Sequence, residues 1–336
     1  MQILRSILFR LASTAVTLVG VAVIVFFVIR VVPGDPIAMM LPPGATDEDI
    51  ARLTALYGLD KSIPEQFLIW ASGVLHGDFG MSITARRPVI ELVLGRLPAT
   101  LELSIMALVI AVIIGGVAAL TGTRERDTKI EGGIDVANGM ALSIPDFLWA
   151  LILILLFGVA WPVFHISGRV TPSLDLPFVT NFYLFESVFR LRFDLWADIV
   201  SHMFMPALAL AIPLAAIIGQ LLKQSLKETM HLDYVTLSRT KGYGENYVII
   251  REALPNAILP TLTLVGVQFT FLIGGTVIIE RLFSYEGLGN MAIDAVINRD
   301  LPLIQGIVIL FAVIFTTVNL VVDLTYALLN PRLRHA

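Results

Sequence analysis

The chain has 336 residues, of which 57% are hydrophobic and 15% are charged, and its mean hydropathy is +0.84. A soluble chain would carry about 25% charged residues, and the apolar residues here form long blocks, so composition predicts an integral membrane protein. The net charge of −4 offers no basic face for nucleic acid. The absence of cysteine excludes disulfides and thiolate metal sites.

The chain begins with a predicted membrane span. Arg5 and Arg10 precede an uncharged run over residues 11–29, which is long enough to cross about 30 Å of hydrocarbon. No small-residue cleavage site follows this run, and Val-Val-Pro-Gly-Asp-Pro stands at 31–36 instead. We therefore predict an uncleaved first span within residues 1–32, with its amino end in the cytoplasm.

Residues 33–95 are expected to form a periplasmic segment, because charged side chains occur throughout them. Patterning predicts a helix at 47–57, a stop at 58–60 and a turn at 76–80. A catalytic pair of His76 and Asp78 is an alternative reading of that turn, but no nucleophile accompanies the pair. No metal site is predicted, because the histidines show no ligand spacing; they stand at 76, 165, 202, 231 and 335.

Five further apolar runs predict five further spans, which makes six. Charged or polar segments at 123–133 and 161–201 connect some of them. Six spans starting inside place both termini in the cytoplasm, and lysine and arginine are denser in the inner loops, as expected. Pro206 and Pro213 predict that the fourth span is kinked or packed against neighbours. The five predicted ranges are 103–122, 134–160, 203–222, 257–279 and 303–329.

Asp146 falls near the middle of the third predicted span, beside Pro145. A carboxylate at mid-membrane costs about 2.5–3.5 kcal/mol on insertion scales, so its side chain should face protein or water. Pro145 removes a backbone donor and can bend the helix there. Two readings stay open: Asp146 pairs with a neighbouring helix or sits shallower than predicted, or it lines a translocation path.

The polar stretch 233–260 interrupts the apolar runs and begins with a predicted helix. Asp233 can cap this helix, and its apolar stripe begins with Tyr234 and Leu237. Basic side chains near a helix end either complement its dipole or pair with acidic residues of a partner. These basic residues are Arg239 and Lys241.

A forced turn and a second helix follow. Gly242 ends the first helix, because the residue after a helix commonly needs a positive φ that glycine adopts without a Cβ penalty. Glu245 suits the start of the second helix, which is expected to run to Leu254 before Pro255. A helix, turn and helix between two apolar spans predicts a docking site for another protein. Residues 233–260 are called the bracket below.

The bracket resembles the cytoplasmic coupling loop of importer permeases in the ATP-binding-cassette superfamily. Gly242 is followed by Leu254-Pro255, as in that loop, although Thr236-Leu237-Ser238 and Glu252 depart from its general pattern. The strings at 233–242 and 253–260 resemble the dipeptide, oligopeptide and nickel branch. Three further segments are similar to the same branch, namely Pro33 to Pro36, Glu280 to Asn290 and Asn330 to Arg332.

The resemblance implies an all-α integral membrane protein with the type I importer permease fold, six transmembrane helices and small periplasmic segments. It implies a transmembrane domain at 96–330 containing a cytoplasmic coupling loop at 223–256, and a cytoplasmic tail at 331–336. Residues expected to couple to the ATPase subunits are Asp233, Tyr234, Leu237, Arg239, Lys241, Gly242, Leu254 and Pro255.

The implied function is transport rather than catalysis. The chain would form half of a path for di- or oligopeptides in the bacterial inner membrane, where Asp146 could meet a peptide's ammonium group. The implied partners are a homologous second permease, two ATPase subunits and a periplasmic binding protein, besides the lipid bilayer, and none is a nucleic acid. No phosphate-binding Gly-x-x-x-x-Gly-Lys-Ser/Thr sequence occurs, so this chain should carry no cofactor, and ATP and Mg²⁺ belong to the partners.

Two alternatives stay open on the sequence. The same machine could carry nickel chelates, sugars or opines, because the binding protein determines most of the substrate choice. An ion-driven secondary carrier is the rival of a different class, and it would predict inverted repeats with paired broken helices. That rival leaves the bracket unexplained.

Overall fold

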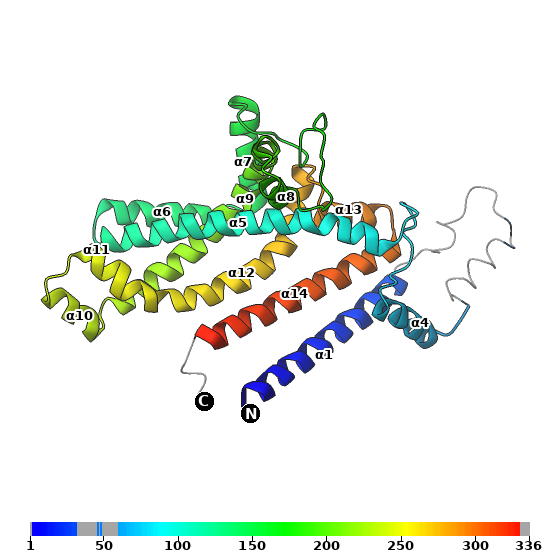
Figure 1. The fold of residues 1–336 in the computed structure, drawn as a ribbon, viewed down its shortest axis with the longest axis horizontal. Helices are drawn as coiled ribbons and strands as arrows, with labels where there is room; N and C mark the ends of the chain where they lie inside the picture. The colour runs from blue at the N-terminus through cyan, green and yellow to red at the C-terminus, as the bar shows by residue number, and fades with distance from the viewer. Residues whose placement is uncertain (1, 32–45, 47, 49–59, 330–336) are drawn as a thin grey trace. The chain divides into compact units, whose positions relative to one another are not determined.

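The computed structural model describes residues 2–31, 46, 48 and 60–329 (Figure 1). Within them the fold is all-helical, as predicted, and the only extended pairing is a bridge between Met81 and Pro88. The elements are α1 (Gln2–Val31), α4 (Ile63–Leu75), α5 (Val89–Arg124), α6 (Lys129–Ser143), α7 (Asp146–Leu153), η1 (Ile154–Ala160), α8 (Tyr183–Phe189), α9 (Phe193–Thr229), α10 (Asp233–Thr240), α11 (Glu245–Tyr247), η2 (Val248–Ala253), α12 (Leu254–Leu282), α13 (Leu288–Ile297) and α14 (Leu301–Leu329), with η1 and η2 π-helical.

Several predicted segments lie outside the described residues. These are the exit sequence after Val31, the helix at 47–57 apart from residue 48, and the tail at 331–336. The turn at 76–80 is described, and it does not assemble a catalytic pair. His76 Nδ1 lies 2.7 Å from the Ser72 carbonyl oxygen, and Asp78 accepts the amide of Gly80 at 2.9 Å.

Four helices of the described residues are long and apolar enough to cross a membrane. They are α5, α9, the continuous helix Glu245–Leu282 and residues Leu301–Val322 of α14. Helices α6 and α7–η1 pass the same test only as a bent pair, and counting this pair as one span gives five candidate spans. In α1 the described apolar part is the shorter stretch Ala12–Val28. The expected count of six spans stays a prediction.

The third predicted span is not one straight helix. It breaks between Ser143 and Asp146, and its two halves are bent by 103°. Ile144 has an extended backbone, with φ −101° and ψ 121°, because a residue before proline is driven out of the helical region. Trp149 Nε1 donates to the Ala141 carbonyl across the break at 3.3 Å. The bend attributed to Pro145 is therefore a complete interruption.

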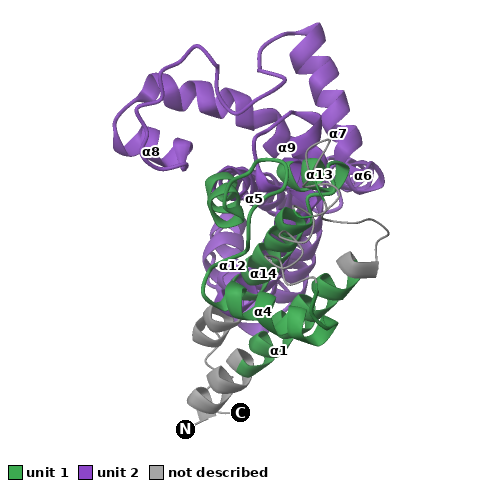
Figure 2. Ribbon diagram, turned by 90° about the vertical axis from the view of Figure 1, so that its right-hand side faces the viewer, with its two compact units in different colours: residues 1–97, 291–317 green, residues 98–290, 318–336 purple. Residues whose placement is uncertain are grey.

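The chain divides into two compact units, coloured separately in Figure 2, and α9 is the core of the larger one (98–290 and 318–336). Helices α6, α7, α8 and α12 pack against α9. Helix α9 begins at Phe193, inside the segment 161–201 that was expected to be a loop, and continues through Pro206 and Pro213. A Cβ atom on Gly115 of α5 would meet the Ala215 carbonyl of α9 at 2.5 Å, so glycine permits this close crossing.

The smaller unit (1–97 and 291–317) is held by aromatic packing and by one aspartate. Phe26 of α1 packs against Phe67 and Trp70 of α4, with ring centroids 5.2 and 5.5 Å away. Asp300 is fully buried and accepts the Ser82 hydroxyl and the Thr84 amide. These bonds hold the segment before α5 against the start of α14.

Candidate functional site

The first arm of the bracket is α10, and it differs in two respects from the prediction. Leu232 is the residue before the helix, and Asp233 is the first residue of the helix. No side chain forms a capping hydrogen bond at this end, so Asp233 is not the cap. Its charge still complements the positive end of the helix. Val235 and Ser238 are buried, whereas Leu237 is 54% exposed. The buried stripe therefore includes the residues beside Leu237 rather than Leu237 itself.

Gly242 ends α10 as predicted, with φ at +84°. Its amide donates to the Arg239 carbonyl at 2.9 Å, and the Tyr243 amide donates to the Ser238 carbonyl at 3.4 Å. This bond pair is the Schellman termination, which satisfies the last carbonyls of a helix. The turn is thus fixed by backbone bonding and by the left-handed conformation of Gly242.

The basic residues at the end of α10 have different surroundings. Arg239 pairs with Glu245, with Nη2 2.7 Å from Oε1, and its Nη1 donates to the Met230 carbonyl at 3.3 Å. The hydrogen bond to Glu245 raises the pKa of Arg239. Lys241 is the residue between α10 and Gly242, and it is exposed. Arg239 is therefore used within the bracket, and Lys241 faces outward.

The second arm continues into the membrane instead of ending at Leu254. It starts at Glu245, widens into a π-helix over Val248–Ala253 and runs on through α12. Pro255 stands in the first turn of α12 and is exposed, and Leu254 is half-buried. A proline inside a helix lacks one donor and crowds the carbonyl four residues earlier. A π-helical turn before it accommodates both effects.

The two arms share a buried apolar cluster with the ends of the neighbouring long helices. Tyr234 braces the arms further, because its hydroxyl donates to the Glu252 carbonyl at 3.4 Å and accepts from Asn256 Nδ2 at 2.8 Å. The bracket is therefore anchored rather than loose. The cluster consists of Ala119, Leu222, Leu226, Met230, Val235, Val248, Ile249, Ala253 and Ala257, with Leu120, Tyr234 and Leu254 packed against it.

The outer side of the bracket exposes large apolar side chains. Leu237 and Ile250 are 54% and 52% exposed, and Tyr243 and Tyr247 are nearly half exposed. The two tyrosine rings stack with centroids 4.6 Å apart. Contiguous exposed apolar side chains are typical of protein–protein interaction sites, and the stacked Tyr243 and Tyr247 form such a contiguous pair. These four residues are called the outer face below.

Asp146 lies apart from the bracket, at the break in the third predicted span. It is the first residue of α7, its side chain is half-buried, and its Oδ1 accepts the amide of Phe147 at 2.8 Å. A carboxylate at this position is stabilised by the positive end of the helix. No residue that the structure describes forms an ion pair with Asp146. Because α6 ends at Ser143 and α7 begins at Asp146, the residue lies at the break between two helices rather than in mid-helix.

Two buried acids of α5 and α12 escaped the sequence interpretation. Glu102 accepts Arg169 Nη2 at 2.7 Å and the amide of Leu184 at 2.9 Å. Glu280 is fully buried and accepts the Thr100 hydroxyl at 2.7 Å. A Cβ atom on Gly287 would collide with the Glu280 carboxylate. For Glu102 the available signal was a lone charge in an apolar run, because such a charge needs a buried partner.

Comparison with known proteins places the chain among transport components. Residues 96–335 match the family described as binding-protein-dependent transport system inner membrane component, and residues 3–104 match the N-terminal part of such components. A solved structure, an amino acid ABC transporter with histidines, covers 72% of this chain and 94% of its own at 18% identity, with a TM-score of 0.47. That similarity is too low to place any residue.

Three relatives match over nearly their whole length. The dipeptide transport system permease protein DppB of Escherichia coli (strain K12) is 38% identical, over 99% of both chains. The glutathione transport system permease protein GsiC of Salmonella choleraesuis is 32% identical, also over 99% of both chains. The oligopeptide transport system permease protein AppB of Bacillus subtilis (strain 168) is 31% identical, over 95% of both.

Proposed function

This chain belongs to the family of binding-protein-dependent transport system inner membrane components, and we propose that it is the permease subunit of an ATP-driven importer for di- and oligopeptides. The relatives support this substrate class, because their names include dipeptide, oligopeptide and glutathione transport. The family is one of transport subunits and not of enzymes, so the energy comes from partner subunits. ATP and Mg²⁺ belong to those partners.

The observation that carries the proposal is the two-sided bracket over residues 233–260. Its inner side is buried in the cluster around Val235 and Val248, and its outer face presents Leu237, Tyr243 and Ile250. A buried inner side keeps the shape of the bracket under load, and an apolar outer face suits a groove on an ATPase subunit. Lys241 and Gly242 would position this face, while Tyr234, Leu254 and Pro255 support it from behind.

The bracket connects directly to the helices that would move. Its first arm follows α9 after a short turn, and its second arm is continuous with α12. Helices α9 and α12 also pack against each other. A pull on the bracket by ATPase subunits closing on ATP would therefore move both helices. Alternation between inward-open and outward-open states needs such a two-state element biased by nucleotide.

The remaining arrangement follows from the family and is part of the proposal. The chain would pair with a homologous second permease, two ATPase subunits and a periplasmic binding protein in the bacterial inner membrane. Both termini and the loop at 223–256 would lie in the cytoplasm, and residues 33–95 in the periplasm. The domain at 96–330 would contain half of the path, with Asp146 beside it, and 331–336 would form the tail.

Reconstitution of the complete complex in proteoliposomes tests the proposal. The vesicles enclose ATP on the side of the ATPase subunits, and the binding protein is added outside with a labelled dipeptide. The dipeptide should then accumulate inside the vesicles. Accumulation should depend on ATP and persist when proton and sodium gradients are collapsed. Uptake driven by an ion gradient without ATP would instead support a secondary carrier. Uptake of a nickel chelate or sugar but of no peptide would correct the substrate class.

A further inference from the structure

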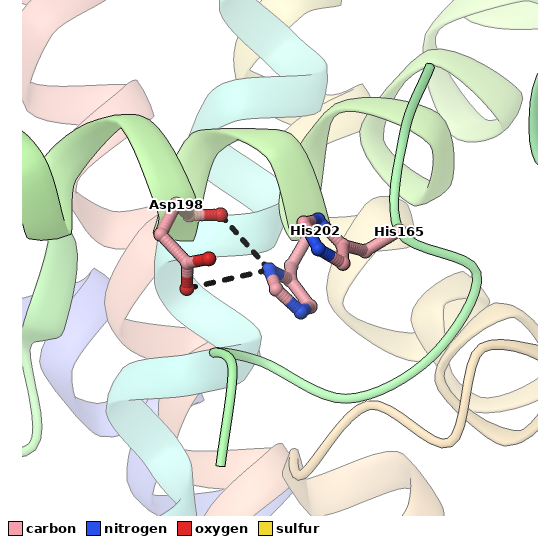
Figure 3. Close-up of side chains that lie close together, drawn as sticks. All are labelled: His165, Asp198 and His202. Carbon is pink, nitrogen blue, oxygen red and sulfur yellow. Dashed lines mark hydrogen bonds and ion pairs between the residues drawn. The ribbon is translucent and has the colours of Figure 1, made fainter. Parts of the chain in front are cut away.

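Two histidines that are far apart in the sequence meet in the larger unit. His165 lies in the segment between η1 and α8, and His202 lies on α9. Their rings are stacked, as Figure 3 shows. The ring centroids are 4.0 Å apart, and the ring planes are 5° apart. Asp198 lies one turn before His202 on α9. One nitrogen of each ring and one carboxylate oxygen lie within 4.8 Å of one another.

The hydrogen bonds around His202 direct one ring nitrogen toward a ligand. His202 is 3% exposed. Its Nδ1 lies 2.9 Å from the main-chain oxygen of Asp198 and 3.6 Å from Oδ2 of the same residue. The main-chain oxygen only accepts hydrogen bonds, so Nδ1 of the neutral ring donates to it and Nε2 keeps its lone pair. Metal-binding histidines are commonly oriented by such an acceptor on the opposite nitrogen. The Asp198 carboxylate is too far from Nδ1 for a hydrogen bond and is not used for this orientation.

His165 has the same tautomer for a different reason. Its Nδ1 lies 2.7 Å from Oγ of Ser201. The Ser201 hydroxyl also lies 2.8 Å from the Asp198 main-chain oxygen, and with its single proton donated there Oγ accepts from the His165 ring. Nε2 of His165 is then a free lone pair as well. Both rings thus offer Nε2, and His165 is exposed, whereas His202 is not.

The Asp198 side chain is oriented by Thr171 and keeps acceptor capacity. Oδ1 accepts the Thr171 hydroxyl at 2.7 Å, and Oδ2 accepts the Thr171 amide at 2.9 Å. Each carboxylate oxygen has about two lone-pair sites, so these bonds orient the group without using it up. Thr171 belongs to the same segment as His165. The cluster therefore joins that segment to α9 through two independent contacts.

We propose that His165, Asp198 and His202 bind a divalent transition-metal ion of the zinc class. Two imidazoles and one carboxylate suit Zn²⁺, Ni²⁺ or Cu²⁺, whereas Mg²⁺ and Ca²⁺ prefer oxygen ligands. Three protein ligands leave a further position open for water or another small ligand. This inference does not depend on the proposed peptide import.

Binding changes the geometry of the cluster in a defined way. An imidazole binds a metal in its own ring plane, so two parallel stacked rings cannot share an ion without movement. Zinc bonds of about 2.0–2.1 Å in a tetrahedral site place ligand atoms about 3.4 Å apart, which is closer than the 4.8 Å seen here. His165 is the exposed partner and turns out of the stack. The Asp198 carboxylate, whose Oδ2 lies 3.6 Å from Nδ1 of His202, turns toward the ion at Nε2, while the His202 ring stays fixed on α9. The bound ion then fastens the segment around His165 to α9.

Zinc titration of the assembled complex tests the site. The complex is purified with an affinity tag free of histidine, stripped with EDTA and titrated with Zn²⁺ by calorimetry, with metal content measured by mass spectrometry. The parent should bind one more equivalent per chain than His165→Asn, or bind it at least about tenfold more tightly. His76→Asn is the matched control, because His76 is also exposed but lies outside the cluster; it should bind as the parent does.

A cysteine variant identifies the ligand directly. The chain has no cysteine, so His165→Cys introduces one thiolate, which also binds zinc-class ions. Titration of this variant with Co²⁺ should produce a thiolate-to-cobalt absorption band that is absent from the parent complex. It should also restore the zinc binding lost in His165→Asn. Equal zinc binding by the parent and His165→Asn, or no such band in His165→Cys, would overturn the proposal.

Discussion

Arg239 and Glu245 join the two arms of the bracket across the Gly242 turn, with Nη2 of the arginine 2.7 Å from Oε1 of the glutamate. Nε of Arg239 also lies 3.3 Å from Oε2. The side chains are 39% and 50% exposed, and exposed ion pairs contribute about 0–1 kcal/mol. The pair therefore sets the angle between the arms more than it stabilises the fold.

Charge reversal should separate this internal pair from docking to a partner. Arg239→Glu places two carboxylates at the turn, so we expect the ATPase subunits to dissociate more readily during detergent purification. The double variant Arg239→Glu, Glu245→Arg should restore their retention, because it rebuilds the pair in the opposite sense. Lys241→Glu tests docking alone. If all three variants retained the ATPase subunits as the parent does, both the role of the Arg239–Glu245 pair and the docking role of Lys241 would be contradicted.

Gly242 should be sensitive to backbone strain and insensitive to bulk. A Cβ atom there meets nothing within 4 Å, but φ is +84°. Alanine should cost on the order of 1 kcal/mol, and asparagine less, because it tolerates the left-handed conformation. Gly242→Pro cannot adopt this φ and lacks the amide bonded to Arg239. We expect Gly242→Asn to couple normally and Gly242→Pro to lose stimulation of ATP hydrolysis by loaded binding protein. Coupled transport by Gly242→Pro would refute this.

Leu237 and Val235 provide a matched pair of truncations on α10. Leu237 is 54% exposed and Val235 is fully buried. Leu237→Ala should keep the melting temperature of the chain and weaken ATPase retention, because it removes part of the outer face. Val235→Ala should lower stability by about 1–3 kcal/mol, as buried truncations do. Melting curves and co-purification distinguish them, and firm ATPase retention by Leu237→Ala would exclude this outer face.

Asp146 should affect transport through its charge if it lines the path. Asp146→Asn keeps the shape of the residue and its acceptor oxygen for the Phe147 amide. We expect normal assembly and slower import of peptides with a free amino terminus, relative to blocked peptides. Asp127→Asn is the control, because the Asp127 side chain is 89% exposed in the turn before α6. An equal effect on both peptides, or loss of the assembled complex, would leave Asp146 a structural role at the start of α7.

Glu186 predicts acid sensitivity of the segment before α9. The hydrogen bond from the Thr180 hydroxyl, with the Val179 and Thr180 amides and Arg190, lowers its pKa from 4.5 to about 2. A lowered pKa in the folded state stabilises the fold above about pH 4.5, and this stabilisation is lost as the pH falls toward 2. Melting temperatures measured at pH 6 and pH 3 should differ more for the parent than for Glu186→Gln. Equal pH dependence would exclude this contribution.

The sequence by itself determined the class of protein and the place of the bracket. Long apolar blocks identify membrane helices because hydrocarbon satisfies no backbone group. Gly242 ended α10 where predicted, since only local backbone conformation is involved. The strings at 233–242 and 253–260 indicated the transport family before any fold was known. These features depend on residues close together in the chain.

Only the tertiary structure decided which side chains face each other. Val235 is buried and Leu237 exposed because the cluster around Leu226 and Val248 covers one side of α10. No spacing rule relates His165 to His202, because the folding of an irregular segment onto α9 brings them together. Side-chain contacts between distant elements depend on how whole helices pack, and local patterns of hydrophobicity and helix-ending residues do not specify that packing.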